Sequence, residues 1–263
     1  MRFKYKSSND DLLTMKIEIC SFSVESCLNA ERAGASRIEL CGGLYEGGTT
    51  PSYGLVLQAR QNVRIPIHVM IRPRGGDFCY SKSELDVMRQ DLQALKNTGI
   101  EGVVFGFLKS NGEIDLALTE EFIAMARPFK VTFHRAFDIT PSPLEALEKL
   151  IELGVDCVLT SGQQPTAEEG ITLLTELVSH AQNRIEIMAG SGINATNAAL
   201  IAQTGVHALH LTAKATRKST MKLCNPPLKM ASALPQEENI IIFSNEGIIK
   251  EVWKAVNQQN INF

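Results

Sequence analysis

Residues 130–162 read KVTFHRAFDITPSPLEALEKLIELGVDCVLTSG and contain a complete strand–helix–strand unit. The first and last segments, 130–138 and 157–162, are short, apolar and rich in branched side chains, as buried parallel strands are. Between them three leucines repeat at helical spacing, and Gly154 stands where a left-handed C-cap ends a helix. The stretch therefore predicts two parallel strands joined through a helix.

The helix of this unit has a recognisable start. Ser142 and Glu145 fit the capping box, with Pro143 at the first helical position. Ser81 and Glu84 repeat the same pattern before another helical stretch. We therefore expect a helix to begin directly after each of the two serines.

The alternation of strand and helix patterns continues through most of the 263 residues. We expect strands at 16–21, 37–42, 65–73, 102–107, 130–138, 157–162, 185–192 and 208–214. A doubly wound sheet usually has fewer strands than eight. The pattern therefore predicts an α/β fold, a single (β/α)8 TIM-type barrel.

Three segments fall outside this alternation. Residues 1–14 are polar and predict a flexible N-terminal extension before a barrel domain at 15–263. Residues 244–259 have the pattern of a closing helix. Residues 215–240 are long for a final loop, so we expect them to fold over one barrel end or to contact a partner chain, as in a homo-oligomer.

Composition excludes several classes of partner. The net charge of −3 and the pI near 6.0 provide no basic surface for a nucleic acid. No apolar run approaches the roughly 20 residues of a transmembrane helix, so no membrane partner is expected. The six cysteines are scattered without a CxxC pair, and no secretory apolar segment is present, which favours reduced thiols and a cytoplasmic location.

Strand parity predicts which side chains face the barrel lumen, because alternate residues point to opposite faces. One parity is almost purely apolar and must pack against helices. The other parity is polar and predicts the lumen: Glu18, Cys20, Glu39, Cys41, His68, Met70, Arg72, Thr132, His134, Glu186, Met188, His210 and Thr212. Unpaired burial of such groups is costly, so they should pair with one another as a structural plug or bind a ligand.

The segment HVMIRPRGGDFCY at 68–80 places a polar cluster at the end of a strand. Active sites of these barrels form at the C-terminal strand ends, so Arg72 should point into the barrel mouth. Gly75 and Gly76 permit a tight turn that brings Asp77 over the rim. The alternative is an Arg–Asp pair that only fixes the loop.

Such polar strand ends predict an enzyme that acts on a small anionic metabolite, phosphorylated or carboxylated. Arginines would hold the anion, and glycine turns would contribute backbone amides. The candidate ligand-binding residues are Arg72, Arg74, Asp77, Ser161, Gly162, Gly190 and Gly192, and the candidate acid/base residues are Glu18, Glu39, His134 and Asp138. A divalent metal held by Glu and His, or a barrel that only binds, are further alternatives.

Five segments of the chain also resemble the CutC family of copper homeostasis proteins. They lie at 38–52, 68–81, 131–138, 158–163 and 188–193, and the order RPRGGDF, TFHRAFD, LTSG is specific to that family. The resemblance extends over residues 15–260. It implies a TIM-type barrel, a cytosolic setting and a role in copper handling, with Cu(I) as the ligand.

Two cysteines fit such a role. Cu(I) is soft and prefers thiolate and thioether ligands. Cys20 and Cys41 share the lumen parity at equivalent ends of two neighbouring strands, so their sulfurs should approach each other, with Met70 as a further sulfur ligand. The alternative is that both cysteines are small buried hydrophobic residues.

Overall fold

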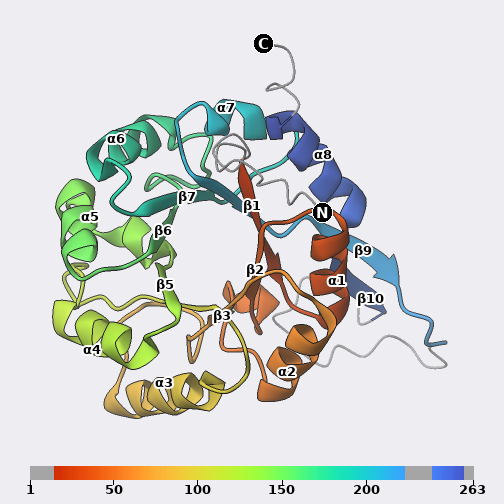
Figure 1. Cartoon of the computed structure of the whole chain (residues 1–263), viewed down its shortest axis with the longest axis horizontal. Coiled ribbons are helices and arrows are strands. Elements are labelled where there is room, and N and C mark those ends of the chain that lie inside the picture. Colours follow the sequence, from red (N-terminus) through yellow and green to blue (C-terminus); the bar gives the residue numbers. More distant parts are fainter. Residues whose placement is uncertain (1–14, 223–238, 258–263) are drawn as a thin grey trace, which may run out of the picture.

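The computed structural model describes residues 15–222 and 239–257. Within these ranges eight parallel strands close into a barrel in sequence order, and β8 pairs back with β1 (Figure 1). The strands are β1 (Lys16–Ser21), β2 (Arg37–Leu40), β3 (Ile67–Met70), β4 (Gly102–Phe105), β5 (Lys130–Phe133), β6 (Cys157–Thr160), β7 (Glu186–Gly190) and β8 (Ala208–Leu211). The predicted TIM-type barrel is confirmed. The predicted extension at 1–14 lies outside the described residues.

Helices surround the barrel (Figure 1). They are α1 (Val24–Arg32), α2 (Tyr53–Asn62), α3 (Lys82–Leu95), α4 (Leu116–Ala126), α5 (Pro143–Glu152), α6 (Ile171–Ala181), α7 (Ala198–Ala202) and α8 (Glu246–Asn257), with short 3-10 helices η2 (Leu44–Glu46) and η3 (Arg135–Ile139). The capping box of Ser81 and Glu84 is confirmed. The one at Ser142 is wrong, because its side chain makes no capping bond and the fixed φ of Pro143 starts α5 instead.

The main hydrophobic core lies between the outer face of the barrel and the helices. It contains the predicted outward residues, among them Ile17, Ile19, Ile38, Leu40, Ile67, Val69, Val131, Phe133, Ile187 and Leu209. The lumen holds two separate small clusters, Cys20, Cys41, Met70 and Val104 in one and Cys157, Leu159, Met188 and Ala208 in the other. The parity prediction is therefore confirmed on both faces.

Glycines on neighbouring strands make room for the lumen imidazoles. A Cβ added at Gly102 would lie 2.4 Å from Cδ2 of His68, and one at Gly106 would lie 2.7 Å from Cε1 of His134. Real Cβ atoms do not approach other atoms so closely, so these glycines are required by the histidines beside them.

Replacement of Gly102 by alanine should therefore lower the free energy of unfolding by about 1–3 kcal/mol, since the imidazole of His68 must move within a packed lumen. Urea denaturation measures this. Gly54→Ala in α2 is the matched control, because nothing lies within 4 Å of the added Cβ, and it should leave stability unchanged or raised. Equal effects of the two substitutions would contradict the packing argument.

A two-stranded antiparallel sheet lies outside the barrel beside α1 (Figure 1). It consists of β9 (Lys214–Lys218) and β10 (Ile240–Ser244), and the backbone of Ser244 bonds both Ser26 and Asn29 of α1. The two ends of segment 215–240 thus belong to this sheet, and residues 223–238 lie outside the described residues. That the segment folds over a barrel end or contacts a partner chain stays a prediction. Among the helices described, none has the length and apolar character needed to cross a membrane.

Candidate functional site

A cavity of about 490 Å³ opens at the C-terminal ends of the barrel strands. This is the end at which barrel enzymes carry their active sites. Its polar and sulfur-bearing wall includes Cys20, Glu39, Met70, Arg72, His134 and His210, and its apolar wall includes Phe22, Leu44, Phe78, Ile193 and Ile248. Most of the predicted lumen residues at this end therefore share one cavity.

Sulfur atoms gather at one side of this cavity. Sγ of Cys20 and Sγ of Cys41 lie 3.8 Å apart, and Sγ of Cys41 lies 3.4 Å from Oε2 of Glu39. Met70 packs in the same buried cluster. The register of β1 and β2 places Cys20 opposite Glu39, which explains the approach. The structure thus brings together the two predicted thiols, and we call Cys20, Cys41, Glu39, Met70 and His210 the thiol cluster.

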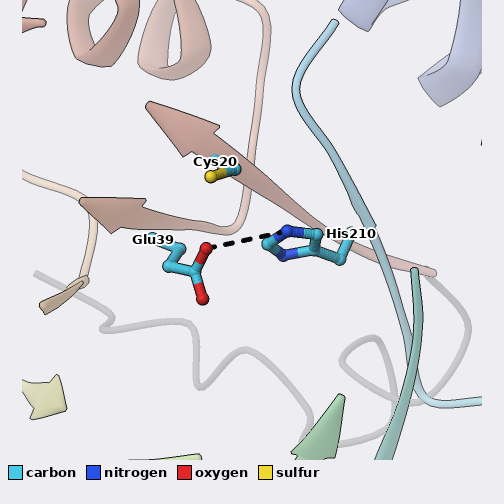
Figure 2. Close-up of side chains that lie close together, drawn as sticks. All are labelled: Cys20, Glu39 and His210. Atoms are coloured by element: carbon cyan, nitrogen blue, oxygen red, sulfur yellow. Dashed lines mark ion pairs between the residues drawn. The ribbon is translucent and has the colours of Figure 1, made fainter. Parts of the chain in front are cut away.

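His210 joins this cluster from β8, the strand that closes the barrel against β1 (Figure 2). Its Nδ1 lies 2.7 Å from Oε1 of Glu18, and its Nε2 lies 3.7 Å from Oε2 of Glu39. Cys20, Glu39 and His210 each offer one ligand atom, and these atoms lie within 4.8 Å of one another. Sequence parity placed His210 in the lumen but did not assign it to the thiol site. The pairing of β8 with β1, which sets His210 opposite Glu18, is what brings it there.

The two thiols of the cluster differ in their protonation. The hydrogen bond with Cys41 lowers the pKa of Cys20 to about 6 against the effect of burial, and His210 adds to this lowering. Burial and the neighbouring Cys20 raise the pKa of Cys41. Burial and the charge of Cys20 also raise the pKa of Glu39. The lowered pKa of Cys20 favours its thiolate, the form that binds metals and acts as a nucleophile.

A buried ion-pair network lies beneath the thiol cluster. Arg37 pairs with Glu18 and, at 3.0 Å, with Oε1 of Glu186. Lys16 contacts the other oxygen of Glu186, Oε2, at 2.8 Å. Burial opposes ionisation of Glu18, but Arg37 and His210 together hold its pKa below the usual range. Glu18 does not line the upper cavity, so its contact with His210 positions that imidazole. Arg37 was not among the predicted lumen residues, although it shares the parity of Glu39 on β2.

Arg72 and His134 form another wall of the cavity. Arg72 is buried, and its fork donates to the carbonyls of Glu46 at 2.9 Å, Gly48 at 3.0 Å and Gly76 at 2.8 Å. It therefore fixes two loops at the barrel mouth. Burial and the charge of Arg72 lower the pKa of His134 to about 3, so this imidazole is neutral.

Arg74 and Asp77 do not line the cavity. Nη2 of Arg74 lies 3.0 Å from Oδ1 of Asp77, and its Nε lies 2.5 Å from Oε1 of Glu84 in the capping box of α3. The side chain of Asp77 is 71% exposed. The structure thus shows the pair that fixes the loop, the alternative reading of this motif.

Asp138 lies in η3, not at the end of a strand, and it organises the loop after β6. Its carboxylate accepts bonds from Oγ1 of Thr160 at 2.5 Å and from Oγ of Ser161 at 3.0 Å. A Cβ added at Gly162 would lie 2.4 Å from the carbonyl oxygen of Gly170, so these two glycines pack closely. In the part of the chain that the structure describes, none of these residues lines the cavity.

The predicted glycines of the seventh strand differ in position. Gly190 is the last residue of β7, and a Cβ there would lie 2.7 Å from Cδ1 of Leu159. Gly192 lines the cavity in a left-handed conformation, with φ of 73°. Only the latter exposes backbone to the cavity.

Comparison with known proteins identifies the family. The sequence profile of the CutC family matches residues 15–215. The chain belongs to the CutC family. A CutC family protein of Bacteroides thetaiotaomicron is 48% identical over 225 residues, covering 85% of this chain and 90% of that protein. The copper homeostasis protein cutC homolog of mouse is 48% identical over 223 residues, covering 84% of this chain and 82% of its own length.

A solved structure of a CutC protein from Streptococcus agalactiae superposes with a TM-score of 0.72 at 36% identity, covering 76% of this chain and 99% of that one. The match to the CutC profile includes every strand of the barrel and each residue of the thiol cluster. Most of the cavity wall is therefore formed by the part of the chain that matches the family, and Ile248 lies beyond it.

Proposed function

We propose that this protein acts in copper homeostasis by binding Cu(I) in the cytosol through Cys20 and Cys41. The supporting observation is the 3.8 Å separation of the two Sγ atoms, in a pair of which Cys20 lines an open cavity. A soft monovalent ion is well served by two thiolates, and one of these thiols already has a pKa of about 6. The name of the mouse relative, a copper homeostasis protein, agrees with this role.

Other members of the thiol cluster would complete the site. Met70 offers a soft thioether beside the two thiols, and imidazole nitrogen is also a ligand for copper. Glu39 is a harder oxygen ligand that suits Cu(I) less well. We therefore assign the two thiols the leading role and Met70 and His210 a supporting one.

Anaerobic titration of the reduced protein with Cu(I) against a competing chelator tests this function. We expect one Cu(I) per chain to be withdrawn from the chelator, because the site offers two thiols in contact. A parallel titration with Zn²⁺ is the control, since Cys, His and Glu are also zinc ligands. Absence of Cu(I) uptake, or preferential retention of Zn²⁺, would contradict the proposal.

A second candidate function is an enzyme that acts on a small anionic metabolite by acid/base chemistry. Two observations favour it. The cavity of about 490 Å³ is far larger than one ion requires, and the surroundings of its ionisable side chains shift their pKa values in different directions. Burial and the charge of Cys20 raise the pKa of Glu39, so this carboxyl can donate a proton. Burial and Arg72 lower the pKa of His134 to about 3, so this imidazole stays neutral and can donate a hydrogen bond. Environments that set the protonation of neighbouring groups apart are typical of acid/base sites.

A further inference from the structure

The wall formed by Arg72 and His134 contains an uncompensated cation. Arg72 is only 6% exposed, and its fork is bonded to backbone carbonyls rather than to carboxylates. The neighbouring acids Asp77 and Glu84 are paired with Arg74. Among residues 15–222 and 239–257, Arg72 forms no ion pair. A buried charge without a counterion is costly, so this wall favours an anion.

Two N–H groups on this wall have no hydrogen-bond partner within normal distance. They are Nε of Arg72 and Nε2 of His134, both buried, and the buried hydroxyl of Tyr80 lies near the guanidinium of Arg72. Nδ1 of His134 accepts from the backbone N–H of Ala136 at 3.2 Å, so the neutral ring carries its proton on Nε2. Both unpaired nitrogens are therefore donors, and both side chains line the same cavity.

Phe78 covers both donors. Its ring centroid lies 4.8 Å from that of the His134 ring and 5.0 Å from Cζ of Arg72. Phe78 comes two residues after Gly76 in the loop that follows β3, and Gly76 has a φ of 81°. Phe78 itself lines the cavity, so its ring lies beside both side chains at the cavity wall.

We propose that Arg72 Nε and His134 Nε2 together bind the carboxylate of a small organic acid with an apolar body, at a site separate from the thiol cluster. One positive charge and two N–H donors match the single charge and two oxygens of a carboxylate. The apolar walls of Phe22, Leu44, Phe78 and Ile248 suit the rest of such a molecule. The inference names the ligand class that the second candidate function requires, and it does not depend on copper binding.

The test uses 4-fluorobenzoate as probe, with binding followed by ¹⁹F NMR on the full chain carrying Cys20→Ser and Cys41→Ser, so that copper plays no part. Acetate and butyrate serve as competitors, 4-fluorobenzamide as the neutral analogue, and inorganic phosphate as the alternative anion. We expect the carboxylates to bind and the amide to bind at least about tenfold more weakly, because it loses the charge-assisted bonds.

Arg72→Ala would also release two loops, so the test uses variants of His134. Two of them separate the Nε2–H donor from the structural bond that Nδ1 accepts from Ala136. In His134→Asn the amide can replace Nδ1 and keep the bond to Ala136, but nothing replaces Nε2. We expect it to weaken benzoate binding about tenfold, and His134→Gln, which can replace Nε2, to weaken it less. Equal binding of acid and amide, an unchanged His134→Asn variant, tighter binding of phosphate, or no binding by any carboxylate would each overturn the proposal.

Discussion

Replacement of both Cys20 and Cys41 by serine is expected to lower the affinity for Cu(I) by more than about 100-fold. Loss of an outer partner of a metal ligand already costs roughly 10–100-fold, and here both soft ligands are removed. Serine is close to cysteine in size, and the two positions lie in a small lumen cluster apart from the main core. The fold should therefore persist, which circular dichroism checks alongside the chelator competition.

A second pair of buried thiols provides the control. Burial raises the pKa of Cys27 to about 12, and burial also raises the pKa of Cys157. Neither thiol belongs to the thiol cluster. The variant Cys27→Ser with Cys157→Ser should keep the Cu(I) affinity of the parent. If the Cys20 and Cys41 variant retained that affinity as well, these two residues would not be the ligands.

Replacement of Arg37 by alanine is expected to lower the free energy of unfolding by about 3–5 kcal/mol at neutral pH, because it leaves buried carboxylates without their cation. Arg37 contacts both Glu18 and Glu186, and the side chain of Glu18 is 1% exposed. Lys16→Ala is the matched control, since this lysine contacts Glu186 from the surface at 56% exposure. Its loss should cost less than about 1 kcal/mol.

The effect of Arg37→Ala should depend on pH in a defined direction. Burial raises and Arg37 lowers the pKa of Glu18, and the net result is a pKa below the usual value of 4.5. The pair therefore stabilises the parent above pH 4.5, and this contribution is lost as pH falls through the folded-state pKa. In the variant, Glu18 can take up a proton, so the difference in free energy of unfolding between parent and variant should become smaller in acid. Urea denaturation at pH values from neutral to below 4.5 measures this difference. A difference that grew in acid would contradict the ion-pair argument.

Much of the barrel and the centre of its site could be predicted from sequence, because strand parity is a local property. Parity alone placed Cys20 beside Cys41, since adjacent strands and a common face leave little freedom. The contact between His210 and Glu18 was harder to predict, because it forms only when the barrel closes and it joins residues 192 positions apart. Register across that seam is set by the whole sheet rather than by either segment.

The loops were less predictable because their side chains depend on backbone conformations that sequence does not specify. Arg72 and Arg74 are two residues apart, yet one is buried against carbonyls and the other holds a surface network. Gly76, with its positive φ, follows both arginines and accepts a hydrogen bond from Arg72 through its carbonyl. The sheet of β9 and β10 was missed because KATRK is polar and exposed, and its partner follows more than twenty residues later.

X-ray absorption at the copper K-edge, on the parent protein loaded anaerobically with one equivalent of Cu(I), tests the proposed role of the thiol pair most directly. The 3.8 Å contact between Cys20 and Cys41 predicts a spectrum dominated by sulfur scatterers. When both cysteines are serine, that signal should fall to at most the one sulfur that Met70 can supply. A first shell of nitrogen and oxygen alone in the parent, or an undiminished sulfur shell in the double variant, would contradict Cu(I) binding at this pair.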